Sequence, residues 1–120
     1  MAKNPTHNTS KTHIADLVYV LEKLGVHRLM ISPGSRSAPL VIALERSEGI
    51  GCMTITDERC AAFFALGVAL ARGEAVGMVC TSGSAPLNYS PALAEAFYQH
   101  VPLIALTADR PNEWIDQGEN

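Results

Sequence analysis

Two of the arginines, each in a short polar segment after an apolar run, are the side chains best suited to bind a ligand. Arg36 lies in the sequence SPGSRS at residues 32–37, and Arg110 lies in TADRP at residues 107–111. A guanidinium is always charged, and its planar fork matches a carboxylate or a phosphate. Together the two arginines can hold a ligand with two carboxylates, or two separate anions. An exposed Asp109–Arg110 ion pair, by contrast, would contribute only about 0–1 kcal/mol to stability.

The segment around Arg36 has a second property of anion sites. Pro33 and Gly34 predict a tight turn, and Ser35 and Ser37 can cap the helix that we expect to follow. Backbone N–H groups at a helix start attract anions. Ordinary helix capping explains the same residues, so both interpretations stay open. The segment is neither GxGxxG nor a Walker P-loop, which argues against dinucleotide or NTP binding.

Glu58 stands where a predicted strand has ended and a helix begins. As a first-turn acid it would favour the helix dipole by ~0.3–1 kcal/mol. The helix that follows, at residues 58–72, is apolar all round, so it needs cover on every side. Because a single sheet covers one side only, we expect a second domain or subunit to cover the rest. Glu58 would then lie in an interface with little water, where a carboxylate needs a specific partner.

A third polar segment, TSGS at residues 81–84, contains Thr81 and Gly83. It lacks the GxSxG pattern of a serine nucleophile, and no His–acid pair is placed to activate a serine there. Hydroxyl and backbone donors at a helix start can instead contact a ligand or cap the helix. The aromatic residues farther along are interpreted as core residues: Tyr89, Phe97 and Tyr98.

The polar segments all follow apolar runs that are nearly continuous, as is typical of strands buried on both faces of a parallel sheet. These runs lie at residues 28–32, 52–56, 76–81 and 103–107. Helices are predicted from Ile14 to Leu24 and at residues 37–47, 58–72 and 85–100. The alternation predicts an α/β fold with a doubly wound, mostly parallel sheet and helices on both faces. Ligands bind such sheets outside the carboxyl ends of the strands, where every polar segment falls.

Composition limits the remaining classes. A chain of 120 residues with 48% hydrophobic and 18% charged residues is ordinary for one globular domain, and we expect residues 1–11 to be a flexible N-terminal tail. The net charge of −3 without a basic run argues against nucleic acid as a partner. No apolar run is long enough to predict a membrane span. The three cysteines lack CxxC spacing and are interpreted as reduced core residues of a cytoplasmic protein.

The polar segments resemble those of one family, the 2-succinyl-5-enolpyruvyl-6-hydroxy-3-cyclohexene-1-carboxylate synthases of menaquinone biosynthesis. SPGSRS followed at this separation by TADRP is specific, and the resemblance runs from about Ile14 to Asn120. The glutamate after the second strand is shared with thiamine diphosphate enzymes generally. The resemblance implies that residues 12–120 form the N-terminal pyrimidine-binding domain. It also implies a C-terminal domain, absent from this chain, that binds the diphosphate and Mg²⁺.

In this family 2-oxoglutarate loses CO₂ on thiamine diphosphate, and the resulting unit adds to isochorismate. The resemblance implies that Glu58 hydrogen-bonds the aminopyrimidine ring and favours its imino tautomer. It implies further cofactor contacts by Pro33, Gly34, Thr81 and Gly83, and substrate contacts by Ser35, Arg36, Arg110 and Asn120. Residues 118–120 read GEN where the family pattern has Gly-Ala-Asn. A homodimer or homotetramer with its active site between subunits is implied as well.

The family's members are several times longer than this chain. The resemblance therefore implies that these 120 residues alone neither catalyse the reaction nor bind the cofactor tightly. Two other functions stay open. Another thiamine diphosphate enzyme, such as an acetohydroxyacid synthase or a 2-oxoacid decarboxylase, would share Glu58 but has no need of both Arg36 and Arg110. A flavodoxin-like module that binds an anion or a partner protein would explain the short chain and the apolar helix.

Overall fold

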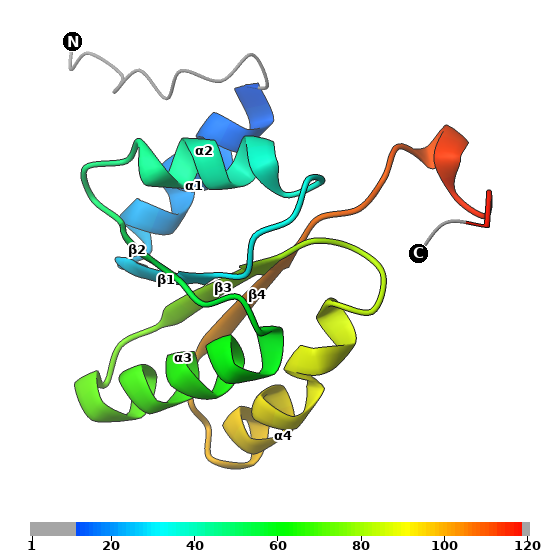
Figure 1. Ribbon diagram of the computed structural model, residues 1–120. Coiled ribbons are helices and arrows are strands. Elements are labelled where there is room, and N and C mark those ends of the chain that lie inside the picture. The colour runs from blue at the N-terminus through cyan, green and yellow to red at the C-terminus, as the bar shows by residue number, and fades with distance from the viewer. Residues whose placement is uncertain (1–11, 119–120) are drawn as a thin grey trace, which may run out of the picture.

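The computed structural model describes residues 12–118, which form a parallel sheet between two layers of helices (Figure 1). The elements in chain order are α1 (Thr12–Lys23), β1 (Arg28–Ile31), α2 (Ala38–Glu45), β2 (Gly51–Thr54), α3 (Glu58–Arg72), β3 (Val76–Cys80), η1 (Pro86–Tyr89), α4 (Ser90–Tyr98), β4 (Leu103–Thr107) and η2 (Asn112–Trp114). All paired strands are parallel, in the order β2-β1-β3-β4. The predicted α/β fold, with helices on both faces of the sheet, is confirmed.

Each face of the sheet has its own core, because successive side chains of a strand point to opposite faces. Leu29 and Ile31 of β1 pack with α1 and α2 on one face. Met30 of β1 and Met78 of β3 pack with α3 and the η1–α4 segment on the other. Figure 1 shows α1 and α2 above the sheet and α3 and α4 below it. The chain therefore winds away from β1 in one direction and from β3 in the other, so the topological switch point lies between these two central strands.

The edge strands β2 and β4 are more exposed than predicted, because the sequence indicated strands buried on both faces. The central strands β1 and β3 are buried almost throughout, as expected. Strand β2 is largely exposed, with Met53 at 47% exposure, and β4 alternates between half-buried and exposed residues. The apolar runs of β2 and β4 are as continuous as those of the central strands. Only strand order decides which strands have a neighbour on both sides, and a run of apolar residues carries no information about that order.

Helix α3 has the predicted bounds, Glu58–Arg72. The Asp57 carboxylate accepts a hydrogen bond from the Cys60 amide at 2.8 Å and caps the first turn. Gly73 ends the helix in the left-handed conformation, with φ 66°. A row of alanines faces the sheet and is fully buried, so the helix lies close to the strands: Ala61, Ala62, Ala65 and Ala69.

The outer side of α3 is uncovered within residues 12–118. Phe63, Phe64 and Leu70 are 46%, 45% and 51% exposed. Cys60 lies on the same side and is exposed too, so the prediction of a core residue is wrong for this cysteine, whereas Cys80 is buried and Cys52 is half-buried. An apolar helix packed on one sheet necessarily leaves such a face. We refer to Phe63, Phe64 and Leu70 as the outer face of α3.

The helical stretch predicted at residues 85–100 divides into η1 and α4, and α4 starts where Ser90 precedes Pro91. A proline at the first turn suits a new helix because it needs no amide donor there. Tyr89 is fully buried, as predicted, but Phe97 and Tyr98 are 74% and 80% exposed, so their assignment to the core is wrong. No helix among residues 12–118 is long and apolar enough to cross a membrane.

Candidate functional site

The polar segments leave the sheet at one edge, as the sequence predicts for parallel strands. Three of the four strands, β1, β2 and β4, continue their hydrogen bonding for one residue after their end. The Ser32 amide donates to the Val79 carbonyl at 2.8 Å, and the Ile55 amide donates to the Ile31 carbonyl at 2.9 Å. The Ala108 amide likewise donates to the Cys80 carbonyl at 3.1 Å. These bonds fix the starting points of these three loops at the carboxyl edge, beside the switch point where α/β sheets bind ligands.

The first and third loops touch directly at the switch point. A Cβ atom added to Gly34 would lie 2.4 Å from Cβ of Thr81 and 2.9 Å from its hydroxyl oxygen. Only glycine permits this approach, because real side-chain contacts do not reach such distances. Gly83 of the third loop has φ 78°, a left-handed conformation that glycine adopts without strain. The structure thus brings Pro33–Gly34 and Thr81 together, as a shared site requires.

The serines of the first loop act differently from the prediction. Ser37 is fully buried and donates a hydrogen bond to the Gly34 carbonyl at 2.9 Å, so it closes the turn. It makes no side-chain cap hydrogen bond to α2. Ser35 is exposed at the tip of the loop. The capping interpretation is therefore wrong for Ser37, and its hydroxyl is not available to a ligand.

Arg36 lies in a pocket beside the first loop. The pocket has a volume of about 310 Å³ and lies between α1, the start of α2 and the residues that follow β4. Its lining includes Arg36 and Asp109 as charged groups, His13 at the rim of α1, and the apolar side chains of Leu17 and Leu40. One cation and an apolar wall within one pocket suit a small carboxylate with a hydrocarbon body.

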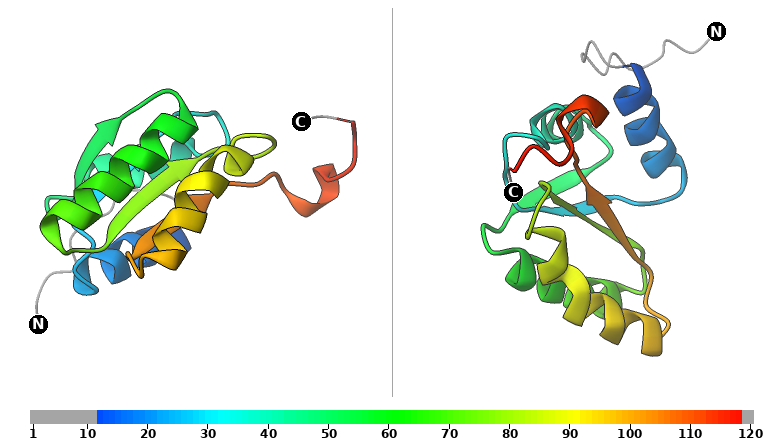
Figure 2. Two further views of the ribbon diagram at one scale, coloured as in Figure 1. Left: turned by 90° about the horizontal axis from the view of Figure 1, so that it is seen from below. Right: turned by 90° about the vertical axis from the view of Figure 1, so that its right-hand side faces the viewer.

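Arg110 follows β4 on the same edge and is half-buried. The Asp109 carboxylate accepts a hydrogen bond from the Arg110 amide at 2.7 Å, which shapes the backbone at this point. From here the chain runs away from the sheet toward η2 (Figure 2). Asn120, the last predicted substrate contact, lies outside the described residues.

Glu58 is the first residue of α3 and is half-buried. Its neighbour Asp57 caps the helix, and the hydrogen bond from the Cys60 amide lowers the pKa of the Asp57 carboxyl. Glu58 also lies near enough to Cys80 and Tyr89 for its charge to help raise the pKa of each, after the larger effect of desolvation. The Glu58 carboxylate therefore follows the residue that caps α3 and lies within electrostatic range of a buried tyrosine.

Two polar residues beneath the edge were not predicted as site residues. Ser32 is 1% exposed, and its hydroxyl donates to the Ile55 carbonyl at 2.9 Å. Tyr89 lies on the same side, fully buried among the core residues that contact α3. Ser32 belongs to the SPGSRS segment, but a serine that ends a buried strand gives no local signal of a role at the site. The tyrosine carries no local signal at all, because its burial depends on the packing of α3 on η1.

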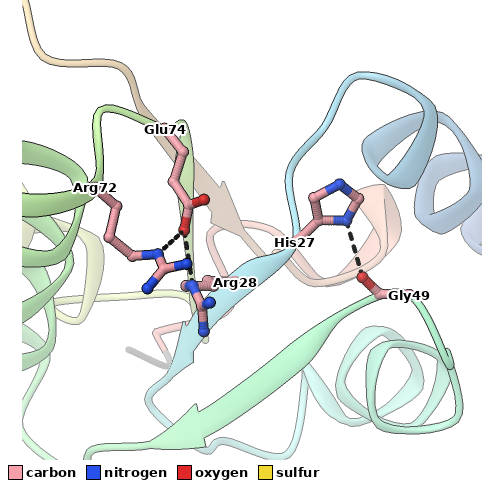
Figure 3. Close-up of polar contacts among 5 residues, drawn as sticks. All are labelled: His27, Arg28, Gly49, Arg72 and Glu74. Atoms are coloured by element: carbon pink, nitrogen blue, oxygen red, sulfur yellow. Dashed lines mark hydrogen bonds and ion pairs between the residues drawn. The ribbon is translucent and has the colours of Figure 1, made fainter.

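The opposite edge of the sheet carries an ion-pair cluster (Figure 3). Oε1 of Glu74 accepts from Nε of Arg28 at 2.7 Å and from Nε of Arg72 at 2.8 Å, which ties the start of β1 to the end of α3. Nδ1 of His27 lies 3.0 Å from the Gly49 carbonyl. A second pocket of about 330 Å³ lies near Arg28 and Arg72, between β2 and α3. It is remote from the polar loops and has no part in the candidate site.

The described part of the chain contains no cluster of metal ligands. Nowhere in residues 12–118 are three His, Cys, Asp or Glu side chains grouped so that they can hold one ion. The carboxyl edge carries the Glu58 carboxylate, backbone and hydroxyl donors, and Arg36 in its pocket; Arg110 follows β4 on the same edge but is not among the residues that line that pocket. These groups can hydrogen-bond a neutral heterocycle and bind carboxylates.

Comparison with known proteins agrees with this arrangement. The family model described as "Thiamine pyrophosphate enzyme, N-terminal TPP binding domain" matches residues 12–120. Proteins called 2-succinyl-5-enolpyruvyl-6-hydroxy-3-cyclohexene-1-carboxylate synthase are similar to this chain in Porphyromonas gingivalis (56% identity over 111 residues), Flavobacterium psychrophilum (52% over 103) and Desulfotalea psychrophila (50% over 111).

These matches cover 92%, 86% and 92% of this chain but 19%, 19% and 21% of the respective relatives. The chain thus spans about a fifth of the length of the curated relatives it matches. The matched region of the family model contains every described element of the fold and all four loops at the carboxyl edge. The chain belongs to the thiamine pyrophosphate enzyme family, in which it corresponds to the N-terminal TPP binding domain.

Proposed function

We propose that this chain is the cofactor-activating domain of a synthase that adds decarboxylated 2-oxoglutarate to isochorismate in menaquinone biosynthesis. The observation that carries the proposal is the position of Glu58. It is the first residue of a capped helix at the carboxyl edge, next to the loops that meet at the switch point. The names of the relatives support the choice of reaction.

The aminopyrimidine half of thiamine diphosphate fits the residues present. An aminopyrimidine offers ring nitrogens and an amino group, and the Glu58 carboxyl can hydrogen-bond a ring nitrogen. Gly34 and Gly83 let the backbone of their loops approach a flat ring without a side chain between, and Pro33 and Thr81 would line the same surface. Residues 12–118 contain no cluster of side chains that could hold Mg²⁺. We therefore assign the binding of Mg²⁺, and of the diphosphate that it accompanies, to the segments that the longer relatives carry.

The cofactor, when bound, supplies the electron sink for decarboxylation. The protein's part is to hold one proton at a defined atom. Glu58 would share a proton with the pyrimidine nitrogen, and the Asp57–Cys60 cap fixes the backbone from which the Glu58 side chain extends. A covered site keeps that proton on the ring rather than in exchange with water.

The arginines suit the substrate. Isochorismate carries two carboxylates, and Arg36 and Arg110 follow β1 and β4 on the same edge. Arg36 lines the same pocket as Asp109, and the apolar wall of this pocket can contact the hydrocarbon ring of the substrate. We assign Ser35, exposed at the loop tip, and Asn120 to hydrogen bonds with the same substrate. A substrate with one carboxylate, such as pyruvate, would leave one arginine without a ligand group.

The outer face of α3 is where we expect a second subunit to pack. Its exposed aromatic and aliphatic side chains lie on the helix that begins with Glu58. Cover over that face would exclude water from the carboxylate and strengthen its hydrogen bond to the ring. We propose a homodimer or homotetramer in the cytoplasm in which a second subunit supplies the cover.

The test uses the chain extended by the segments that its relatives carry beyond it. With thiamine diphosphate and Mg²⁺ present, loss of isochorismate is measured in wild type, Glu58→Gln and Arg36→Ala. Glu58→Gln is expected to abolish turnover while the cofactor still binds, because glutamine keeps the shape but cannot share the proton. Arg36→Ala is expected to raise KM for isochorismate more than it lowers kcat. Full activity of Glu58→Gln would contradict the assigned role.

A further inference from the structure

The ion-pair cluster at the edge opposite to the polar loops carries more positive than negative charge. Figure 3 shows both guanidinium groups at one oxygen of Glu74, which accepts from Nε of Arg28 at 2.7 Å and from Nε of Arg72 at 2.8 Å. The hydrogen bond from Arg28 lowers the Glu74 pKa, and Arg72 adds to this effect, so the carboxylate is charged at neutral pH. Most N–H donors of an arginine are on its Nη groups, which take no part in these two bonds. The cluster can therefore bind one further anion.

Both arginines line the pocket of about 330 Å³ between β2 and α3. The rest of the lining is apolar, and none of the described residues that line it is acidic. The pocket exists because α3 packs mainly on β3 and β1, which leaves the edge strand β2 exposed. Gly51 is the register partner of Arg28, and its lack of a side chain leaves space beside the guanidinium. Two cations beside an apolar wall suit a small carboxylate with a hydrocarbon body.

The apolar wall is built of side chains from two strands and one helix. Met30 of β1 and Met53 of β2 are register partners and so lie on the same face of the sheet, the face on which α3 packs. Phe64 and Val68, one turn apart on α3, line the pocket from the helix. Met53 and Phe64 are 47% and 45% exposed, so an apolar group in the pocket would take both out of water. Methionine side chains adapt to the shape of their neighbours, which suits a flexible aliphatic chain.

We propose that this pocket is a second ligand site, which binds a small aliphatic carboxylate. The carboxylate of the ligand accepts hydrogen bonds from the Nη groups of Arg28 and Arg72, and its chain lies between β2 and α3. Glu74 holds the two guanidinium groups at one point, because its oxygen bonds both, but its charge repels that of the ligand. The inference does not depend on the role proposed for Glu58, because the pocket is remote from the polar loops.

The first experiment measures octanoate binding to the extended protein by titration calorimetry at low salt. Arg72→Gln is expected to weaken binding about three- to tenfold, because one of two exposed cations is lost. Glu74→Gln is expected to tighten binding about threefold, because glutamine keeps an oxygen for both arginines but removes the competing charge. Arg46→Gln is the matched control, since Arg46 is exposed and does not line the pocket. A protein that does not bind octanoate, or a Glu74→Gln protein that binds it more weakly than wild type, would overturn the inference.

A ligand series tests the apolar part of the site. From butanoate through hexanoate to octanoate, the affinity is expected to rise about fourfold for each methylene group buried, and 1-octanol, which lacks the charge, should bind at least about tenfold more weakly than octanoate. Gly51→Val should abolish binding because the new side chain fills the pocket, while its Cβ meets nothing closer than the His27 carbonyl oxygen at 3.7 Å. An affinity that is independent of chain length, or unchanged in Gly51→Val, would refute the assignment to this pocket.

Cysteine labelling then locates the ligand. Cys52 lines the pocket, whereas the exposed Cys60 does not. Saturating octanoate should slow the alkylation of Cys52 by iodoacetamide several-fold and leave the rate at Cys60 unchanged, as measured by peptide mapping of the extended protein. Equal slowing at both cysteines, or no slowing at Cys52, would place octanoate elsewhere on the protein and contradict the proposal.

Discussion

The contact between Gly34 and Thr81 predicts a large penalty for a single methyl group. In Gly34→Ala the new Cβ would lie 2.4 Å from Cβ, 2.7 Å from Cγ2 and 2.9 Å from Oγ1 of Thr81. Carbon atoms in ordinary contact are about 3.5–4.0 Å apart, so one loop must retreat by roughly 1 Å. Overpacking of this kind typically costs about 1–3 kcal/mol. The cause is crowding rather than backbone strain, because Gly34 does not have a positive φ.

Urea denaturation of the purified chain measures this cost, and the chain offers a control of opposite sign. Gly67 is in the interior of α3, and a Cβ there would meet no atom within 4 Å. Gly67→Ala is therefore expected to stabilise by about 0.5–1 kcal/mol, because alanine loses less backbone entropy in a helix. The same substitution should thus lower the free energy of unfolding at Gly34 and raise it at Gly67.

A second substitution tests whether Thr81 causes the penalty. Thr81→Gly removes the three atoms that lie nearest to the Gly34→Ala methyl. The double variant should therefore lose less stability than the two single variants together, by an interaction energy of about 0.5–3 kcal/mol. Additive losses would show that the crowding is elsewhere, and a Gly34→Ala protein as stable as wild type would refute the contact itself.

Three further predictions concern the rest of the fold. Asp57→Ala should lower the urea midpoint near neutral pH. Because the Cys60 amide holds the Asp57 pKa below 3.8, this loss of stability should vanish as the pH falls through the lowered pKa. A loss of stability that persists in acid would exclude the cap. Iodoacetamide should modify Cys60 first and the buried Cys80 last, with Cys52 slowed by partial burial and by a pKa of about 11; early labelling of Cys80 by peptide mapping would contradict this order. Glu74→Gln should lower stability at low salt and less so at high salt, since its partners are exposed arginines; a salt-independent loss would point to packing.

The fold was predictable because helices and strands alternate with distinct patterns. The bounds of α3 follow from Asp57 as a cap and Gly73 as a stop. The carboxyl edge follows from the parallel sheet alone, so Arg36 and Glu58 were placed on one edge without knowledge of strand order. Burial was predicted less well, because it depends on neighbours. Cys60 and Phe97 lie in apolar stretches but face outward.

The sequence identified the site residues whose charged or polar side chains lie near the surface, but not the buried residues that support them. Ser37 reads as a helix cap, yet its hydroxyl closes the turn on the Gly34 carbonyl. Ser32 and Tyr89 come from segments more than 50 residues apart, and Tyr89 comes near Glu58 because η1 packs on α3. A contact of this kind is set by strand order and helix position, neither of which leaves a local mark in the sequence.

Substrate choice by the extended protein tests the proposed reaction. With thiamine diphosphate and Mg²⁺ supplied, isochorismate loss is followed with 2-oxoglutarate, with pyruvate in its place, and without either 2-oxoacid. We expect isochorismate to disappear only with 2-oxoglutarate, in step with CO₂ release. Turnover of pyruvate with isochorismate left intact would contradict it and make the protein a different thiamine diphosphate enzyme.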